Sequence, residues 1–211
     1  MSQRVGDHPK ARRQRTGEPI ALAVPPGVRL RITPASFWRL CVANRDLRLE
    51  RTAKGELIVM PPAAADSGRR NMSLGAQLWY WNQRTGLGVA FDSSAGFTLP
   101  NTAVRGPDAS WMTRERWDAL PLAEREKFAH VSPDFVIELR SKSDTMKVLR
   151  DKMREYLAQG ARLGWLIDPK SGTVEIHRPD RPVEVLNRPA TLSGEGVLPG
   201  FVLDLKGILF D

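Results

Sequence analysis

The sequence of 211 residues contains one cysteine and only three histidines, and each scarcity excludes a class of protein. A lone Cys41 cannot form an internal disulfide or a thiolate metal cluster, so a reducing cytoplasm is the expected compartment. Cys41 lies between two aliphatic residues, which favours a buried, inert thiol over a nucleophile. The three histidines lie in no motif, which argues against a histidine-based mechanism: His8, His130 and His177.

Long apolar stretches are also missing. Because no run of about eighteen apolar residues occurs, the sequence predicts no transmembrane span. The N-terminus is basic but lacks the apolar block of a signal peptide. No amphipathic basic helix is evident, so attachment to a membrane surface is not expected either.

What is abundant is positive charge. The formal net charge is +8, which favours an anionic partner, with nucleic acid first. Part of it comes from residues 1–27, which are rich in Arg, Pro and Gly and show no periodicity, so we expect a disordered basic tail there. Five basic and two acidic residues give this tail +3, which leaves +5 for residues 28–211. These residues suit one sizeable domain.

Hydrophobic periodicity predicts a mixed α/β domain with a central sheet. Residues 134–139 read as a strand, followed by a helix to 159 capped by Ser143 or Asp144, and by a strand over 163–167. Such a unit predicts two parallel strands joined by a right-handed crossover. Further strands are predicted over 47–50, 56–60, 108–112, 173–177, 183–186 and 201–205, a hairpin over 89–91 and 96–99, and helices over 34–41, 66–86 and 114–129.

Two acids stand where strands of this sheet begin or end. In the segment 133–140, PDFVIELR, alternation puts Asp134 and Glu138 on one face of the strand, about 13 Å apart. Since that separation is too large for one ion, Glu138 needs a partner from another strand, and Asp108 after Gly106-Pro107 is the best placed acid. The alternative for Glu138 is an ion pair with Arg140 or another arginine. Asp134 is better explained by turn chemistry, bonding nearby backbone amides.

Two carboxylates and an amine are the groups that a metal-dependent phosphodiesterase needs. The predicted helix after Glu138 offers Lys152 at one border of its apolar stripe and Arg150 at the other. Helical geometry alone does not choose between these two cations. Most helical lysines are simply surface residues.

The order of several motifs resembles a widespread bacterial family of restriction-endonuclease-like proteins, first described as a domain of unknown function. That family belongs to the PD-(D/E)xK superfamily. The resemblance covers about residues 33–205 and rests on these matches: LE at 49–50, GELI at 55–58, MP at 60–61, GPDAS at 106–110, PDFVIELRS at 133–141, then Lys152, Tyr156 and Gly160, WLIDP at 165–169, and LPGFVLD at 198–204. It implies a restriction-endonuclease-like core, a mixed sheet flanked by helices, over residues 28–211.

The resemblance also implies roles. Asp108 and Glu138 would bind Mg²⁺ or Mn²⁺, and Lys152 would be the catalytic lysine, moved from the strand position that Arg140 holds here. Arginine stays charged near neutral pH, which supports Lys152 as the base or water-orienting group. Glu50 would be an extra metal or water contact.

Three arginines are candidates for holding the nucleic-acid backbone: Arg69, Arg70 and Arg140. Many relatives carry a histidine where this chain has Gly68-Arg69-Arg70-Asn71, groups that suit phosphate binding. The expected activity is a metal-dependent endonuclease that hydrolyses phosphodiester bonds of nucleic acid, DNA first, in a homodimer. Two alternatives stay open, a catalytically silent nucleic-acid-binding module and a structural or regulatory protein.

Overall fold

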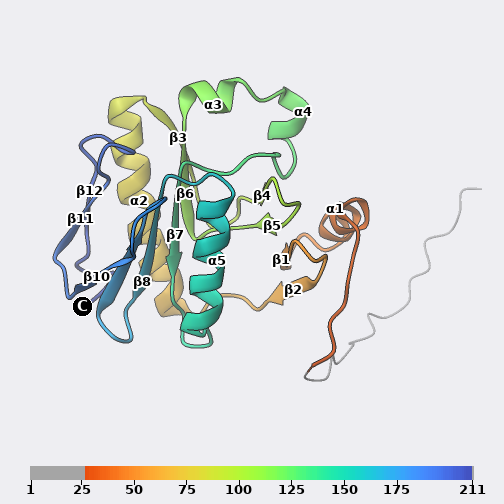
Figure 1. The fold of residues 1–211 in the computed structure, drawn as a ribbon, viewed down its shortest axis with the longest axis horizontal. Coiled ribbons are helices and arrows are strands. Elements are labelled where there is room, and N and C mark those ends of the chain that lie inside the picture. Colours follow the sequence, from red (N-terminus) through yellow and green to blue (C-terminus); the bar gives the residue numbers. More distant parts are fainter. Residues whose placement is uncertain (1–26, 211) are drawn as a thin grey trace, which may run out of the picture.

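The computed structural model describes residues 27–210, so the tail expected over residues 1–27 lies, but for Gly27, outside the described residues. Figure 1 shows a central sheet with a long helix on either side and a smaller sheet beside it. Within residues 27–210, no helix is long and apolar enough to cross a membrane.

The central sheet has six strands in the order β10-β9-β8-β7-β6-β3, and it is mixed as predicted. Only β7 and β8 run parallel, joined by α5 as a strand–helix–strand unit, and every other neighbouring pair is antiparallel. The bounds are β3 Gly88–Phe91, β6 Ala109–Thr113, β7 Phe135–Leu139, β8 Leu163–Asp168, β9 Thr173–His177, β10 Glu184–Asn187 and α5 Met146–Ala158.

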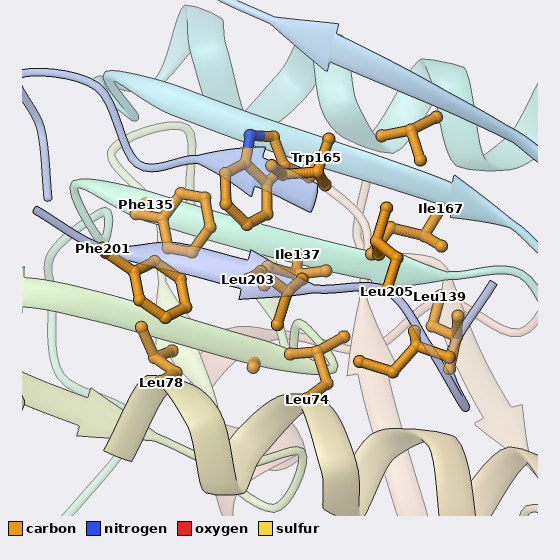
Figure 2. Packing of buried hydrophobic residues seen from close by; sticks show 14 of the residues in the cluster. Leu74, Leu78, Phe135, Ile137, Leu139, Trp165, Ile167, Phe201, Leu203 and Leu205 are labelled. Carbon is orange, nitrogen blue, oxygen red and sulfur yellow. The ribbon is translucent and has the colours of Figure 1, made fainter. Parts of the chain in front are cut away.

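Alternation along β7 divides the core between the two faces of the sheet. Phe135, Ile137 and Leu139 pack on the side of helix α2 (Ala65–Thr85), together with the small sheet of β11 (Thr191–Ser193) and β12 (Val202–Asp204). Figure 2 shows Leu74 and Leu78 of α2 directed at this layer. Val136 packs on the opposite side, against α5. Glu138 therefore shares the face of β7 that α5 covers.

A second sheet, in the order β2-β1-β5-β4, lies beside α5. The turn predicted at Lys54-Gly55 joins its first two strands, and Gly55 adopts φ of 82°, which favours glycine. The bounds of its strands and of the remaining helices are β1 Arg48–Arg51, β2 Leu57–Met60, β4 Phe97–Thr98, β5 Val104–Arg105, α1 Pro34–Ala43, α3 Arg114–Asp118 and α4 Leu122–Arg125.

Several local predictions were wrong. The segments 89–91 and 96–99 do not form a hairpin, because β3 pairs with β6 of the central sheet and β4 pairs with β5. The helix α5 is capped by Thr145, whose hydroxyl accepts from the Val148 amide, while Asp144 accepts from Ser141 instead. The charged segment 114–129 forms two short helices, α3 and α4, in place of one.

Candidate active site

Asp108 and Glu138 lie side by side at the end of the β6–β7 ladder. The last paired residues are Ala109 and Ile137, so the next positions on the two strands are Asp108 and Glu138. The Leu139 amide donates to Asp108 Oδ2 at 2.8 Å, which fixes this carboxylate against β7. The two acids thus occupy neighbouring positions, and their sharing of a metal ion stays a prediction.

Lys152 is the cation that reaches these acids. From the second turn of α5, its Nζ lies 2.8 Å from Glu138 Oε1 and 2.9 Å from Glu50 Oε1 of β1. All three side chains are at least nine-tenths buried. Arg150, the other candidate, turns away and pairs with Glu175 at 2.6 Å. The fold thus makes the choice that helical geometry could not.

A second ring of polar groups holds Glu50 and Lys152 in place. Glu50 accepts from the Gly106 amide at 3.0 Å and from Arg105 at 3.1 Å. Arg105 in turn pairs with Glu155 at 2.6 Å, one turn along α5 from Lys152. These contacts tie the second sheet, through β1 and β5, to α5 across the site, so the amine of Lys152 has little freedom to move.

Burial and crowding perturb the protonation of this centre. Burial, with Asp108 and Glu50 nearby, raises the pKa of Glu138 to about 7 even though Lys152 is adjacent. Burial alone would lower the pKa of Lys152, but Glu138 and Glu50 raise it above its usual value. Burial would raise the pKa of Glu50, yet Lys152 and Arg105 hold it below the ordinary value. Lys152 is therefore a permanent cation near neutral pH.

Tyr156 completes the buried side of the centre. Its hydroxyl donates to Glu138 Oε1 at 3.1 Å, and burial followed by the charges of Glu138 and Glu50 raises its pKa well above the usual value. It therefore acts as a neutral hydrogen-bond donor. Perturbed groups of this kind, clustered at one place, are typical of functional sites.

Arg48 and Asn71 flank Asp108 on the other side. Arg48 Nη1 and Asn71 Nδ2 each lie 3.4 Å from Asp108 Oδ1, and Arg48 also donates to the Gly106 carbonyl at 2.8 Å. Two buried atoms of this pair, Arg48 Nε and Asn71 Oδ1, have no hydrogen-bond partner among the described residues.

The donor set is compatible with a hard divalent cation. The centre holds four carboxylates, those of Glu50, Asp108, Glu138 and Glu155, against the three cations Arg48, Arg105 and Lys152. It therefore carries a negative excess when all are ionised. Within the described residues no group of three or more His, Cys, Asp or Glu side chains is arranged to hold a metal. Mg²⁺ commonly uses one or two carboxylates and keeps several waters, so Asp108 and Glu138 are the residues that could hold such an ion.

Comparison with known proteins shows the family and the fold of the chain. The family model Uma2, described as "Putative restriction endonuclease", matches residues 34–206. The chain belongs to the Uma2 family. A solved structure titled as a putative nuclease belonging to DUF820 from Anabaena variabilis is 22% identical, covers 84% of this chain and 97% of its own, and superposes with a TM-score of 0.70. No curated protein matches.

The arginines predicted to hold nucleic acid are not part of this centre of the Uma2 chain. Arg140 pairs with Asp168 at 2.7 Å, where it braces the ends of β7 and β8. Arg69 and Arg70 both pair with Asp66 in their own helix and donate to the carbonyls of Gly207 and Ile208. Each of the three thus has a structural contact.

Asp134 also lies outside the site, but the turn chemistry predicted for it is wrong, because its partners come from a segment about twenty residues earlier. It accepts from the Thr113 amide at 2.9 Å and from Arg116 at 2.7 Å, so it fastens the end of β6 to β7.

Four residues of the site were missing from the sequence-based set: Arg48, Arg105, Glu155 and Tyr156. Arg48 is two residues before Glu50 in the same strand, so the alternation of β1 was a signal that could have placed both on one face. Arg105 immediately precedes Gly106-Pro107-Asp108 and carried no such signal. Glu155 follows Lys152 by three residues on α5, a spacing that puts the two on neighbouring positions of the helix surface.

Proposed function

We propose that this Uma2 chain is an Mg²⁺- or Mn²⁺-dependent endonuclease that hydrolyses phosphodiester bonds of DNA. The observation that carries the proposal is the buried Lys152 amine, within 3 Å of Glu138 and Glu50 and beside the facing carboxylate of Asp108. A structural ion pair alone needs one acid for one base. Here the four carboxylates of Glu50, Asp108, Glu138 and Glu155 face three cations, and this negative excess fits a site that is completed by a further cation.

In this proposal Asp108 and Glu138 hold the metal. When bound, the ion lowers the pKa of a coordinated water and neutralises charge on the scissile phosphate. Glu138 and Glu50 raise the pKa of Lys152 and so favour its charged form, which supports a role in orienting the attacking water and stabilising negative charge over a role as the base. This narrows the two roles, base or orienting group, that the sequence left open for it.

Glu50 is a positioning residue in this scheme. Its Oε1 lies 2.9 Å from Lys152 Nζ, and its charge helps to raise the pKa of that amine. The net charge of +8 supports nucleic acid as the substrate class, and the single cysteine supports work in the cytoplasm.

The test is cleavage of plasmid and single-stranded DNA with Mn²⁺, Mg²⁺ or EDTA. The proteins compared are the wild type, Glu138→Gln, Lys152→Met and the control Lys147→Met, which makes the same change at an exposed position of α5. We expect metal-dependent cutting that falls at least about a hundredfold in the first two variants and is unchanged in the control. Cutting that survives in both would place the activity elsewhere.

If the wild type cuts DNA with neither Mn²⁺ nor Mg²⁺, the proposal is wrong. Salt-sensitive DNA binding in EDTA would then favour the silent binding module, since such binding comes from phosphate contacts alone. Without that binding, a structural or regulatory role would be left.

A further inference from the structure

Arg48 differs from the other two cations of the centre in how far solvent reaches it. Its side chain is 33% exposed, whereas the side chains of Arg105 and Lys152 are exposed by only 11% and 10%. Carboxylates hold these two cations closely, at 2.6 to 3.1 Å. Arg48 meets its carboxylate, Asp108, at 3.4 Å, which is longer than the roughly 2.7–2.9 Å of a charge-assisted hydrogen bond. Arg48 is therefore the cation of the centre that a group from solvent can engage.

The hydrogen-bond donors of Arg48 are not all used within the described part of the chain. Nη2 donates to the Gly106 carbonyl at 2.8 Å and Nη1 approaches Asp108, while Nε is buried and has no partner there. A guanidinium has five N–H donors and no acceptor. A further group that binds Arg48 must therefore be an acceptor.

The position of Arg48 relative to the acids indicates which acceptor this is. Arg48 Nη2 and Lys152 Nζ both contact the Gly106 carbonyl, at 2.8 and 3.4 Å. The guanidinium lies next to Asp108, and the amine lies 2.8 Å from Glu138. Arg48 thus lies beside the carboxylates that would hold the metal, and a phosphate drawn to a cation on Asp108 is drawn to the same place.

Charge and shape favour phosphate over a neutral acceptor. A divalent cation on Asp108 takes over the negative charge that now faces Arg48, so the guanidinium then needs another anion. A phosphate supplies that charge, and its oxygens match the planar, paired donors of a guanidinium.

We infer that Arg48 binds the backbone phosphate that reaches the Asp108–Glu138 metal site, so β1 supplies a substrate-binding residue. The inference rests on the proposed function. It adds a phosphate contact inside the centre, whereas the three arginines proposed from the sequence lie outside it. Because a phosphate contact carries no sequence information, its loss should weaken binding equally for unrelated sequences.

Fluorescence anisotropy of two unrelated labelled DNA duplexes, between about 50 and 200 mM salt, tests the assignment. Ca²⁺ serves as the hard divalent probe, and gels check that the DNA stays intact. Arg48→Met removes charge and donors, and Arg48→Lys keeps the charge. The matched control is Arg162→Met, because Arg162 makes a similarly long contact with an aspartate, 4.0 Å from Asp134 at the opposite end of β7.

We expect Arg48→Met to bind both duplexes about tenfold more weakly at the lowest salt. The slope of the logarithm of the binding constant against the logarithm of the salt concentration should become shallower by about one. Arg48→Lys should keep the wild-type slope and bind more weakly than the wild type. Arg162→Met should match the wild type in both quantities.

Calorimetric titration with Mn²⁺ separates this role from a structural one. Arg48→Met should bind Mn²⁺ at least as tightly as the wild type, because a cation beside Asp108 has been removed. Loss of Mn²⁺ binding in Arg48→Met would show that Arg48 only supports the site, and the inference would be wrong.

Two further results would overturn the inference and leave a metal-dependent nuclease intact. One is an unchanged affinity and salt slope in Arg48→Met, and the other is an equal loss in Arg162→Met. A wild type that binds neither duplex and cuts no DNA would overturn the inference and the proposed function together.

Discussion

At the scale of single residues, the central feature is one amine between two buried carboxylates. Lys152 contacts Glu138 and Glu50 at 2.8 and 2.9 Å. Removing one partner of a buried ion pair leaves an uncompensated charge, whereas removing both leaves much less. The fold therefore depends on Lys152 even where no substrate is present.

We expect Lys152→Met to lower the free energy of unfolding by about 3–5 kcal/mol. The double variant Lys152→Met/Glu138→Gln should lose less than the sum of the two single changes, by about 1 kcal/mol or more. Urea unfolding at pH 8 in EDTA measures this, since Glu138 is then ionised. Additivity within about 0.5 kcal/mol would show that the two groups are not coupled.

His177, which lies away from the site, makes the stability of the fold depend on pH. It is buried on β9 with Nε2 3.2 Å from Glu175, and burial lowers its pKa in spite of that carboxylate. In the unfolded chain a histidine takes up a proton near pH 6.5. The stabilising contribution is therefore complete above about pH 6.5 and is lost as the pH falls below it.

Thermal unfolding from pH 8 to pH 5 should consequently show a steeper decline for the wild type than for His177→Gln. The difference between the two proteins is the quantity to follow, because it isolates His177 together with its contact to Glu175. Parallel curves would contradict the assignment.

At the scale of elements, the pairing of β3 with β6 depends on Gly88. A Cβ at this position would lie 2.1 Å from the Met112 carbonyl oxygen and 2.4 Å from the Trp111 ring. Backbone and a buried indole cannot yield easily, so the strands would have to separate. Glycine at position 88 therefore permits the close β3–β6 pairing that is observed in place of the hairpin expected for residues 89–99.

Gly88→Ala should lower the free energy of unfolding by about 1–3 kcal/mol. Gly75→Ala is the matched control, since a Cβ on this α2 glycine meets nothing within 4 Å. There we expect a gain of about 0.5–1 kcal/mol from helix propensity. Chemical denaturation of the two variants would test whether the free energy of unfolding falls in Gly88→Ala and rises in Gly75→Ala. An unchanged free energy of unfolding in Gly88→Ala would contradict the close approach.

At the scale of the whole molecule, α2 carries large apolar side chains on its outer surface. Met72, Trp79 and Tyr80 are each more than half exposed and recur at a spacing of seven and eight residues, which places them on one helix face. Exposed apolar patches are typical of interaction sites. The homodimer expected from the sequence remains a prediction that this surface supports.

Light scattering should give a molar mass twice that of the 23.6 kDa chain. The mass should not change between low and moderate salt, because an apolar interface is little affected by screening. A monomer at concentrations of tens of micromolar would contradict the prediction.

The sequence by itself determined the features that depend on local order. Alternation and helical periodicity identified β7, α5 and β8 and their parallel pairing, and they gave Glu138 its face of the strand. Asp108 and Glu138 could be proposed as partners because strand ends have a fixed geometry. A distance of 13 Å within one strand was enough to exclude Asp134 as a partner of Glu138.

Only the tertiary structure decided which groups meet around those acids. The second sheet brings Glu50 of β1 to Lys152, whereas Arg150 pairs with Glu175 of β9 in the central sheet. These contacts distinguish the two cations, which helical periodicity did not. Arg48 and Asn71 converge on Asp108 from segments 60 and 37 residues away. Contacts of this kind have no period in the sequence, because they depend on how separate elements pack, and packing is settled by the whole core at once.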